Sequence, residues 1–280
     1  MGTSKSNSGP GKTPLLPDWY NPQPPLPDKD EENENTDTVP DDDKKDDVIK
    51  PSNDQIESWR SAKTNLTSYI KNKTPANLKR SARSYVKNYG GAKKASSTAI
   101  IGKSTAATFI GFINNLSANG INSAAESFGV KSFDGLDVKG LFALLANEIA
   151  PDGDTPEAAV ARAAVTETLC DIYKDIENEG GDISTLDSIL KDKENEYVIL
   201  YLSNYIFFRW VHELGETFEI KKISANQLIN IENEMREFIK ISLQEKWTKQ
   251  NLKAVDFNTP SGKQIVDQVF EQAYLIIEDL

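Results

Sequence analysis

The amino group of Gly2 is the group in this sequence best suited to covalent chemistry. The chain begins Met1-Gly2-Thr3-Ser4-Lys5-Ser6, and a glycine in second position normally allows the initiator methionine to be removed. The α-amine that remains has a reference pKa of about 8, so at neutral pH a larger fraction of it is the unprotonated nucleophile than of a lysine amine. Because glycine has no Cβ to obstruct a reagent, the sequence indicates that the Gly2 amine is accessible and could be bound by another protein.

The same hexad fits the outline of an N-myristoylation signal. A single acyl chain binds membranes only marginally and is usually reinforced by basic neighbours, whereas the stretch that follows this segment is acidic. The composition, rich in asparagine, lysine and isoleucine, is typical of bacteria, in which this acylation is not expected. No membrane partner is therefore predicted.

Two motifs resemble the end of a phosphate-binding loop, but neither is complete. Gly11-Lys12-Thr13 and Gly102-Lys103-Ser104 have Ser6 and Ser97 where the first glycine of such a loop would stand. A phosphate cradle also needs a preceding strand and the N-terminus of a helix to converge on the glycines. ATP binding is not expected, and no cofactor is predicted.

Side chains for acid–base or metal chemistry are few. His212 is the only histidine, so a zinc protease or a histidine-based hydrolase is not expected within this polypeptide. Glu213, Glu216 and Glu219 share one flank of a predicted helix, and they could form a carboxylate site if they were buried together. A solvated helix face is the alternative interpretation. No catalytic residue and no metal ligand is predicted.

Cysteine use and hydropathy favour a soluble cytoplasmic protein. Cys170 is the only cysteine, so no internal disulfide is possible, and its spacing predicts a small buried apolar residue. The first thirty residues contain no apolar signal segment. The most apolar stretch, Tyr197 to Val211, contains Arg209 and is shorter than the roughly 20 residues that a bilayer requires. It predicts a central core helix.

Charge divides the chain into blocks. From Asp28 to Asp54, 12 acidic residues stand against 4 basic ones. Residues 55–125 contain 11 basic residues and one acid, Glu57, whereas residues 126–280 contain 15 basic and 29 acidic residues. Such asymmetry indicates an interaction surface or an internal electrostatic match.

A basic patch in the second block has two interpretations. It consists of Lys79, Arg80, Arg83, Lys87, Lys93 and Lys94. These residues could contact the phosphates of a nucleic acid, with Tyr85 and Tyr89 as stacking faces. Alternatively, they meet acidic segments of the same chain or remain solvated.

Residues 1–53 predict a disordered N-terminal arm. A Gly/Ser/Lys segment is followed by a proline-rich segment from Pro14 to Pro27 and then by an acidic run that is nearly without apolar residues. Four large apolar side chains stand out in the proline-rich segment: Leu15, Leu16, Trp19 and Tyr20. They predict a docking peptide for a partner, although packing onto the chain's own body explains them equally well.

From Asp54 onward the pattern is helical. Apolar periodicity and caps predict a helix from Asn53 or Asp54 and a second one that starts at Thr74-Pro75, with Thr74 as its cap, and ends at Gly90-Gly91. The segment 92–118 predicts one long or two short helices, and a short helix is expected at 136–149. Asp154-Thr155-Pro156-Glu157 is the start signal of a helix at 157–179, and further helices are predicted at 183–191, 194–218, 225–249 and 260–278. Gly102 and Gly111 are expected either to allow close helix approach or to mark a break. Three tryptophans at apolar helix positions, Trp59, Trp210 and Trp247, are expected in the core.

The fold class predicted is therefore all-α: a helical bundle body preceded by the disordered arm. The charge blocks divide the body into a basic helical region (54–125) and an acidic helical bundle region (126–280).

Two segments of the chain resemble the QatB family, the B component of the QatABCD anti-phage defence system. The first contains Met1 to Ser6, Gly9-Pro10 and Pro14-Leu15-Leu16-Pro17-Asp18-Trp19; the second is Arg83-Ser84-Tyr85-Val86-Lys87-Asn88-Tyr89-Gly90-Gly91-Ala92 with Ala95. The resemblance covers the arm and roughly residues 80 to 116.

The resemblance implies three partners: an ATPase, a QueC-like enzyme of deazaguanine chemistry and a TatD-like metal-dependent nuclease. It further implies that the QueC-like enzyme attaches a deazaguanine group to Gly2, with Thr3, Ser4, Lys5 and Ser6 entering its cleft. The leading hypothesis is a non-enzymatic adaptor that is modified at Gly2. The alternatives are a nucleic-acid-binding module that uses the basic patch and an enzyme with a carboxylate site.

Overall fold

The computed structural model describes residues 53–130, 136–178, 193–215, 224–249, 252, 255–257 and 259–280. Every regular element within these ranges is an α-helix, which confirms the predicted all-α class. The helices all belong to one compact unit, Ile49–Leu280. The predicted arm, apart from Asn53, and the predicted helix at 183–191 lie outside the described residues.

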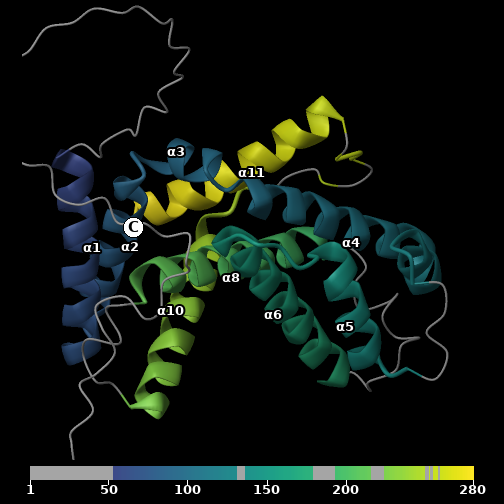
Figure 1. The fold of residues 1–280 in the computed structure, drawn as a ribbon, viewed down its shortest axis with the longest axis horizontal. Coiled ribbons are helices and arrows are strands. Elements are labelled where there is room, and N and C mark those ends of the chain that lie inside the picture. Colours follow the sequence, from purple (N-terminus) through teal and green to yellow (C-terminus); the bar gives the residue numbers. More distant parts are fainter. Residues whose placement is uncertain are drawn as a thin grey trace, which may run out of the picture. The chain divides into compact units, whose positions relative to one another are not determined.

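One helix, α8 (Glu194–Leu214), forms the centre of the core. Of its 21 residues, 14 are buried, as expected of a helix that is apolar on most of its circumference. It packs against α4 (Ile100–Ser127), α6 (Pro156–Asn178) and α10 (Ala225–Lys246). Figure 1 shows α6 and α10 on either side of α8. The predicted central core helix is confirmed.

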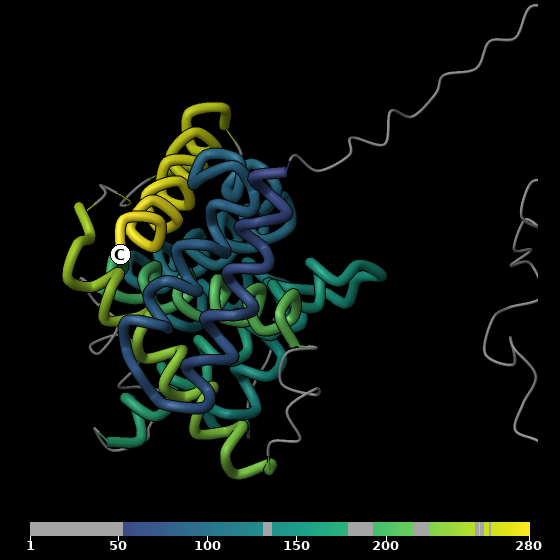
Figure 2. Tube along the Cα trace, turned by 90° about the vertical axis from the view of Figure 1, so that its left-hand side faces the viewer, coloured from purple at the N-terminus to yellow at the C-terminus, as the bar shows by residue number. Residues whose placement is uncertain are grey.

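A second set of contacts is organised by the C-terminal helix, α11 (Pro260–Glu278). It packs against α2 (Pro75–Asn88), α3 (Ala92–Ser97), α4 and α10. The first helix, α1 (Asn53–Asn72), pairs with α2, and the two run side by side in Figure 2. The remaining helix of the described part, α5 (Val138–Ile149), packs on α6 and α4.

Most helix starts follow their sequence signals. The Thr155 hydroxyl accepts a hydrogen bond from the Ala158 N–H at 3.1 Å, and Ser224 forms a capping box at the start of α10. Thr74 occupies the N-cap position of α2 as predicted, but its side chain makes no capping hydrogen bond. Its backbone N–H instead donates to the Asn72 side chain at 3.2 Å. Pro75, in the first turn, fixes the start of α2 without that capping hydrogen bond.

Gly102 and Gly111 differ in what surrounds them. A Cβ at Gly102 would lie 2.3 Å from the ring of Tyr205, so glycine is needed for α4 to approach α8, as the sequence predicted. The Tyr201 hydroxyl donates to the Gly102 carbonyl at 2.9 Å. A Cβ at Gly111 would meet nothing within 4 Å. The kink of α4 lies instead at Gly120, whose φ is 80°.

The proposed division of the body into a basic region (54–125) and an acidic region (126–280) describes the charge of the sequence and does not coincide with a boundary between helices. Position 125 lies inside α4. Buried residues from both sides of this position belong to a single hydrophobic cluster.

The tryptophans agree with the sequence prediction, whereas the cysteine does not. Trp210 is buried, and Trp59 and Trp247 are partly buried and packed against the same cluster. Cys170 is exposed on α6, so its predicted burial is wrong. It follows Leu169 on the helix, and the turn of about 100° per residue carries its side chain away from the buried face.

Glu234 of α10 forms hydrogen bonds that connect the α1–α2 pair to the rest of the body. Its carboxylate accepts hydrogen bonds from the Tyr69 hydroxyl and the Lys73 ammonium, both at 2.5 Å. Partial burial acts to raise the pKa of Glu234, but the hydrogen bonds from Lys73 and Tyr69 outweigh it and lower the pKa below its usual 4.5.

We expect Glu234→Gln to lower the free energy of unfolding at pH 7 by about 1 kcal/mol or less, the range of half-exposed ion pairs. Because the folded pKa lies below the unfolded one, the stabilisation is present above the unfolded pKa and is lost as the pH falls through the folded pKa. In urea denaturation, the free energies of unfolding of the wild type and of Glu234→Gln should therefore become equal as the pH is lowered from 7 to 3. Glu237→Gln, an exposed neighbour on α10, is the control, and a difference that does not change with pH would contradict the assignment.

Candidate functional site

The predicted site residues divide into those that the structure describes and those that it does not. The modified amine, the enzyme-recognition peptide and the docking peptide lie outside the described residues, and their roles stay predictions: Gly2, Thr3, Ser4, Lys5, Ser6, Leu15, Leu16, Trp19 and Tyr20. All six residues of the predicted basic patch are described.

The residues of the basic patch lie on two consecutive helices. Lys79, Arg83 and Lys87 recur every four residues on α2, which places them on one side of the helix. Arg80 lies beside them, and Lys93 and Lys94 belong to the short helix α3. Arg83 is half-buried and the other five are exposed. We call these six residues the basic surface.

The basic surface is not neutralised by the described acidic residues. Within the described ranges, none of the six side chains forms an ion pair. Two other lysines of the same basic region do form one: Lys73 pairs with Glu234 at 2.5 Å, and Lys103 pairs with Asp267 at 2.7 Å. The predicted internal electrostatic match is therefore observed for these two lysines, and for none of the six within the described ranges.

The turn between α2 and α3 is built on two glycines. Gly90 and Gly91 have φ values of 89° and 98°, which residues with a side chain rarely adopt. The predicted helix end at this pair is confirmed. The Ala92 N–H then donates to the Glu278 carboxylate of α11 at 2.8 Å, and this bond holds α3 against α11.

The predicted stacking role of two tyrosines is wrong. Tyr85 is fully buried, and its ring stacks on Trp210 at a centroid distance of 6.1 Å. Tyr89 is half-buried; its ring faces the Arg209 guanidinium at 4.5 Å and its hydroxyl donates to Glu213. The apolar face of α2 turns both rings toward the core, so neither can stack on a nucleic acid base.

A buried guanidinium, that of Arg209 in α8, lies behind the basic surface. It is 7% exposed. It donates to the Ala95 carbonyl at 3.1 Å, to the Thr98 hydroxyl at 2.8 Å and to the Tyr274 hydroxyl at 3.0 Å. These acceptors belong to the end of α3, to the turn after it and to α11, so one side chain joins three segments to the central helix.

A fourth donor of this guanidinium, Nε–H, reaches the carboxylate next to the lone histidine. Arg209 Nε donates to Glu213 at 3.1 Å, and Tyr89 donates to the same oxygen. Burial raises the pKa of Tyr89 and also raises the pKa of Tyr274, to about 12. Both phenols are therefore protonated at neutral pH; the Tyr89 hydroxyl donates to Glu213, and the Tyr274 hydroxyl accepts from Arg209. In the sequence, the only sign of this structural role of Arg209 was its position as a charged residue inside an apolar stretch.

The carboxylate hypothesis is tested only at Glu213, since Glu216 and Glu219 lie outside the described residues. Glu213 lines a cavity of about 400 Å³ together with Glu157 and His212. Glu157 accepts hydrogen bonds from the Gly102 N–H and the Tyr205 hydroxyl, both at 3.1 Å. Both glutamates thus accept from structural donors. Among the described residues, no group of three His, Cys, Asp or Glu side chains could hold a metal ion.

Replacing tyrosine by phenylalanine should have different effects on stability at positions 85 and 89, because only one of the two hydroxyls has a hydrogen-bond partner. Tyr85→Phe removes a buried hydroxyl that has no hydrogen-bond partner, so we expect unchanged stability or a gain of about 1 kcal/mol. Tyr89→Phe removes the hydroxyl that donates to Glu213 and should cost about 1–3 kcal/mol. Guanidinium chloride unfolding of both variants measures the difference, and the opposite order would contradict the described network.

Comparison with known proteins gives a family. The family model of QatB, described as Qat anti-phage system associated protein QatB, matches residues 90–277. The match includes Gly90, Gly91, Ala92 and Ala95 of the sequence resemblance, together with Arg209. No curated protein and no solved structure matches the chain. None of the helices in the described part has both the length and the apolar composition needed to cross a bilayer.

Proposed function

The chain belongs to the QatB family of Qat anti-phage system associated proteins, and from this premise we propose that it is a non-enzymatic helical adaptor. Its N-terminal Gly2 is the acceptor for a deazaguanine-type modification by a QueC-like partner enzyme. Its body docks the other components of the defence system, an ATPase and a TatD-like nuclease. Since phage replication takes place inside the host cell, the proposal places the protein in the cytoplasm.

The family match carries the defence role, and the chemistry of the first residues supports Gly2 as the acceptor. The nitrogen that forms the new bond must be unprotonated, and an α-amine fulfils this condition at neutral pH better than a lysine side chain. Glycine leaves the approach to that nitrogen open. Thr3 to Ser6 are short or unbranched beyond Cβ, and we propose that they enter the cleft of the QueC-like enzyme.

A non-enzymatic body is supported by the way in which its glutamates are used. Glu157 accepts from Gly102 and Tyr205, and Glu213 accepts from Arg209 and Tyr89. A general base needs a lone pair directed at the substrate. One oxygen of each carboxylate, Oε1, accepts from donors within the fold, which supports a structural role for both glutamates.

Intact-mass spectrometry tests the acceptor. Protein co-expressed with the other components of its system should gain the mass of one deazaguanine group, and fragmentation should place that mass on Gly2. Lys5→Arg is the matched control: it removes the nearest lysine amine and should leave the modification in place. Gly2→Ala, which keeps the α-amine but adds a Cβ, should lower the modified fraction several-fold. An unmodified Gly2 in an active system would contradict the proposal.

One observation favours nucleic-acid binding as a second function. The basic surface carries six cations without an ion-pair partner among the described residues. Clustered cations bind phosphates by releasing condensed counterions. Because Tyr85 and Tyr89 are turned into the core, we propose contact with the phosphate backbone alone, without preference for a sequence.

Salt dependence tests this second function. Fluorescence anisotropy with a 20-mer duplex should show binding that weakens steeply between about 50 and 200 mM salt. Arg80→Glu combined with Lys87→Glu should abolish it, whereas Lys139→Glu combined with Lys249→Glu makes the same change of charge elsewhere and should retain it. Binding that does not respond to salt, or that survives the first pair of substitutions, would exclude the basic surface as the contact.

A further inference from the structure

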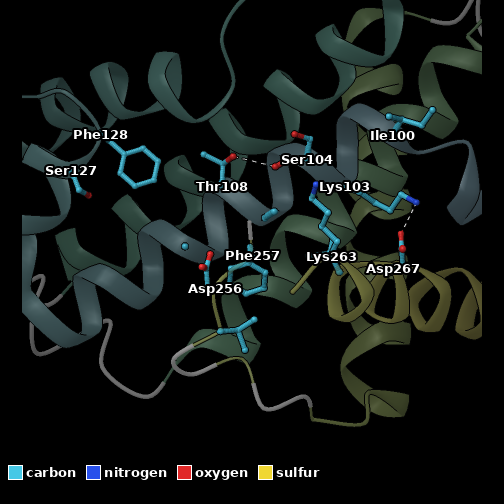
Figure 3. Close-up of a pocket in the computed structure, with 14 residues that line it drawn as sticks. Ile100, Lys103, Ser104, Thr108, Ser127, Phe128, Asp256, Phe257, Lys263 and Asp267 are labelled. Carbon is cyan, nitrogen blue, oxygen red and sulfur yellow. Dashed lines mark hydrogen bonds and ion pairs between the residues drawn. The ribbon is translucent and has the colours of Figure 1, made fainter. Parts of the chain in front are cut away.

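A cavity of the described residues lies between α4, α11 and the short segment at 255–257. It has a volume of about 840 Å³ and is open to solvent on one side. Figure 3 shows that it is elongated, with Ser127 and Phe128 at one end and Lys103, Lys263 and Asp267 at the other. This volume lies in the range of ligand and peptide sites. We call this cavity the α4–α11 groove.

One face of α4 forms the floor of the groove, and among the described helices α11 covers this face only in part. Ile100, Ser104, Ala107 and Gly111 follow one another at intervals of three and four, so they share this face. Ile100 is 69% exposed, although it is a large apolar residue of a largely buried helix. At Gly111 a side chain would meet nothing within 4 Å, which leaves a hollow in the floor.

The opposite wall is held in place by specific bonds. The Asn114 side chain of α4 donates to the Leu252 carbonyl at 2.6 Å. The Thr259 hydroxyl donates to the Asp256 carbonyl at 2.6 Å. A Cβ at Gly262 would lie 2.2 Å from that same carbonyl, so glycine at this position lets the 255–257 segment cross the first turn of α11. The wall is part of the fold.

The two ends of the groove differ in chemistry. At one end Phe128 supplies an apolar surface, and its ring packs edge-on against Phe112 at a centroid distance of 5.6 Å. At the other end two ammonium groups face one carboxylate, because Lys103 pairs with Asp267 at 2.7 Å while Lys263 has no ion pair with a described residue. Figure 3 shows the Lys263 side chain extending from α11 toward α4. Asp256 lies on the wall between the two ends.

We propose that the α4–α11 groove binds an extended segment of a partner protein, with apolar side chains at the Phe128 end and a carboxylate at the Lys263 end. The floor from Ile100 to Gly111 is about 16 Å long at about 1.5 Å per residue. An extended chain covers that length with about five residues. The net positive charge of the Lys103–Lys263 end matches the carboxylate, and the hollow at Gly111 accepts an apolar side chain.

A phosphate ligand fits this groove less well. The amide of Gly102 near the start of α4, which would have to bind a phosphate, already donates to Glu157 at 3.1 Å. The carboxylate of Glu157 also offsets the positive end of the α4 dipole. Lys263 is then the one cation of the groove that is free of an ion pair among the described residues, and a single ammonium matches a single carboxylate.

The groove does not depend on Gly2, so the inference can be tested apart from the proposed modification. Calorimetric titration of the full chain uses an acetylated pentapeptide with phenylalanine and leucine at its first two positions and aspartate at its last. This peptide should bind at least tenfold more tightly than a peptide with serines in place of the two apolar residues. It should bind about fivefold more tightly than one with a terminal lysine in place of aspartate.

Two pairs of variants locate the binding. Gly111→Leu fills the hollow and should weaken binding at least tenfold, whereas Gly111→Ala adds one methyl group and should keep it within about twofold. Both substitutions raise helix propensity, so the fold is retained. Lys263→Glu should reverse the preference, so that the lysine-ended peptide binds more tightly than the aspartate-ended one. Lys249→Glu, an exposed lysine that does not line the groove, should change nothing.

Three results would overturn the inference. They are the absence of binding by the aspartate-ended peptide, equal binding by Gly111→Leu and the wild type, and a charge preference that Lys263→Glu does not reverse. Circular dichroism at the titration temperature confirms the fold of each variant. If Gly111→Leu does not fold, the reversal of preference by Lys263→Glu decides alone.

Discussion

The arrangement of this fold depends on the partners of one buried cation. Arg209 lies in the middle of the core on α8, and a guanidinium taken out of water without partners costs several kcal/mol. Its acceptors are the carbonyl of Ala95, the hydroxyls of Thr98 and Tyr274, and the carboxylate of Glu213. They come from segments far apart in sequence, so α3, the turn after it and α11 must all reach α8 for the charge to be satisfied. These bonds also fix the position of Lys93 and Lys94, the part of the basic surface that lies on α3.

A second constraint operates at α4 and explains why the groove is open. Gly102 brings α4 so close to Tyr205 of α8 that no side chain fits between them. Glu157 of α6 accepts from both Gly102 and Tyr205, which fixes the start of α4 relative to two helices at once. One face of α4 is therefore committed to the core. The opposite face, from Ile100 to Gly111, is turned toward α11, and α11 covers it only in part.

Hydrophobic periodicity and local signals were sufficient to predict where the helices lie in the sequence, but not how the helices pack against one another. The glycine pair at 90–91, the Thr155-Pro156 start and the apolar run of α8 each act within a few residues, and the structure has them as predicted. The helical period of 3.6 residues does not determine which other helix packs on each face of a helix. The sequence therefore could not predict that Tyr85 is buried, that Cys170 is exposed or which groups accept from Arg209. The groove was unpredictable for the same reason: Gly111 and Phe257 are separated along the chain and meet only through packing.

The described residues use their charges in two ways. The carboxylates nearest the lone histidine are engaged by structural donors, whereas six cations on α2 and α3 and Lys263 on α11 have no ion pair among the described residues. A charge left unpaired on a surface adds little to stability, but it raises the rate at which an oppositely charged partner finds that surface and selects among partners. The buried charges of this body therefore determine its fold, and the exposed ones are available to determine what it binds.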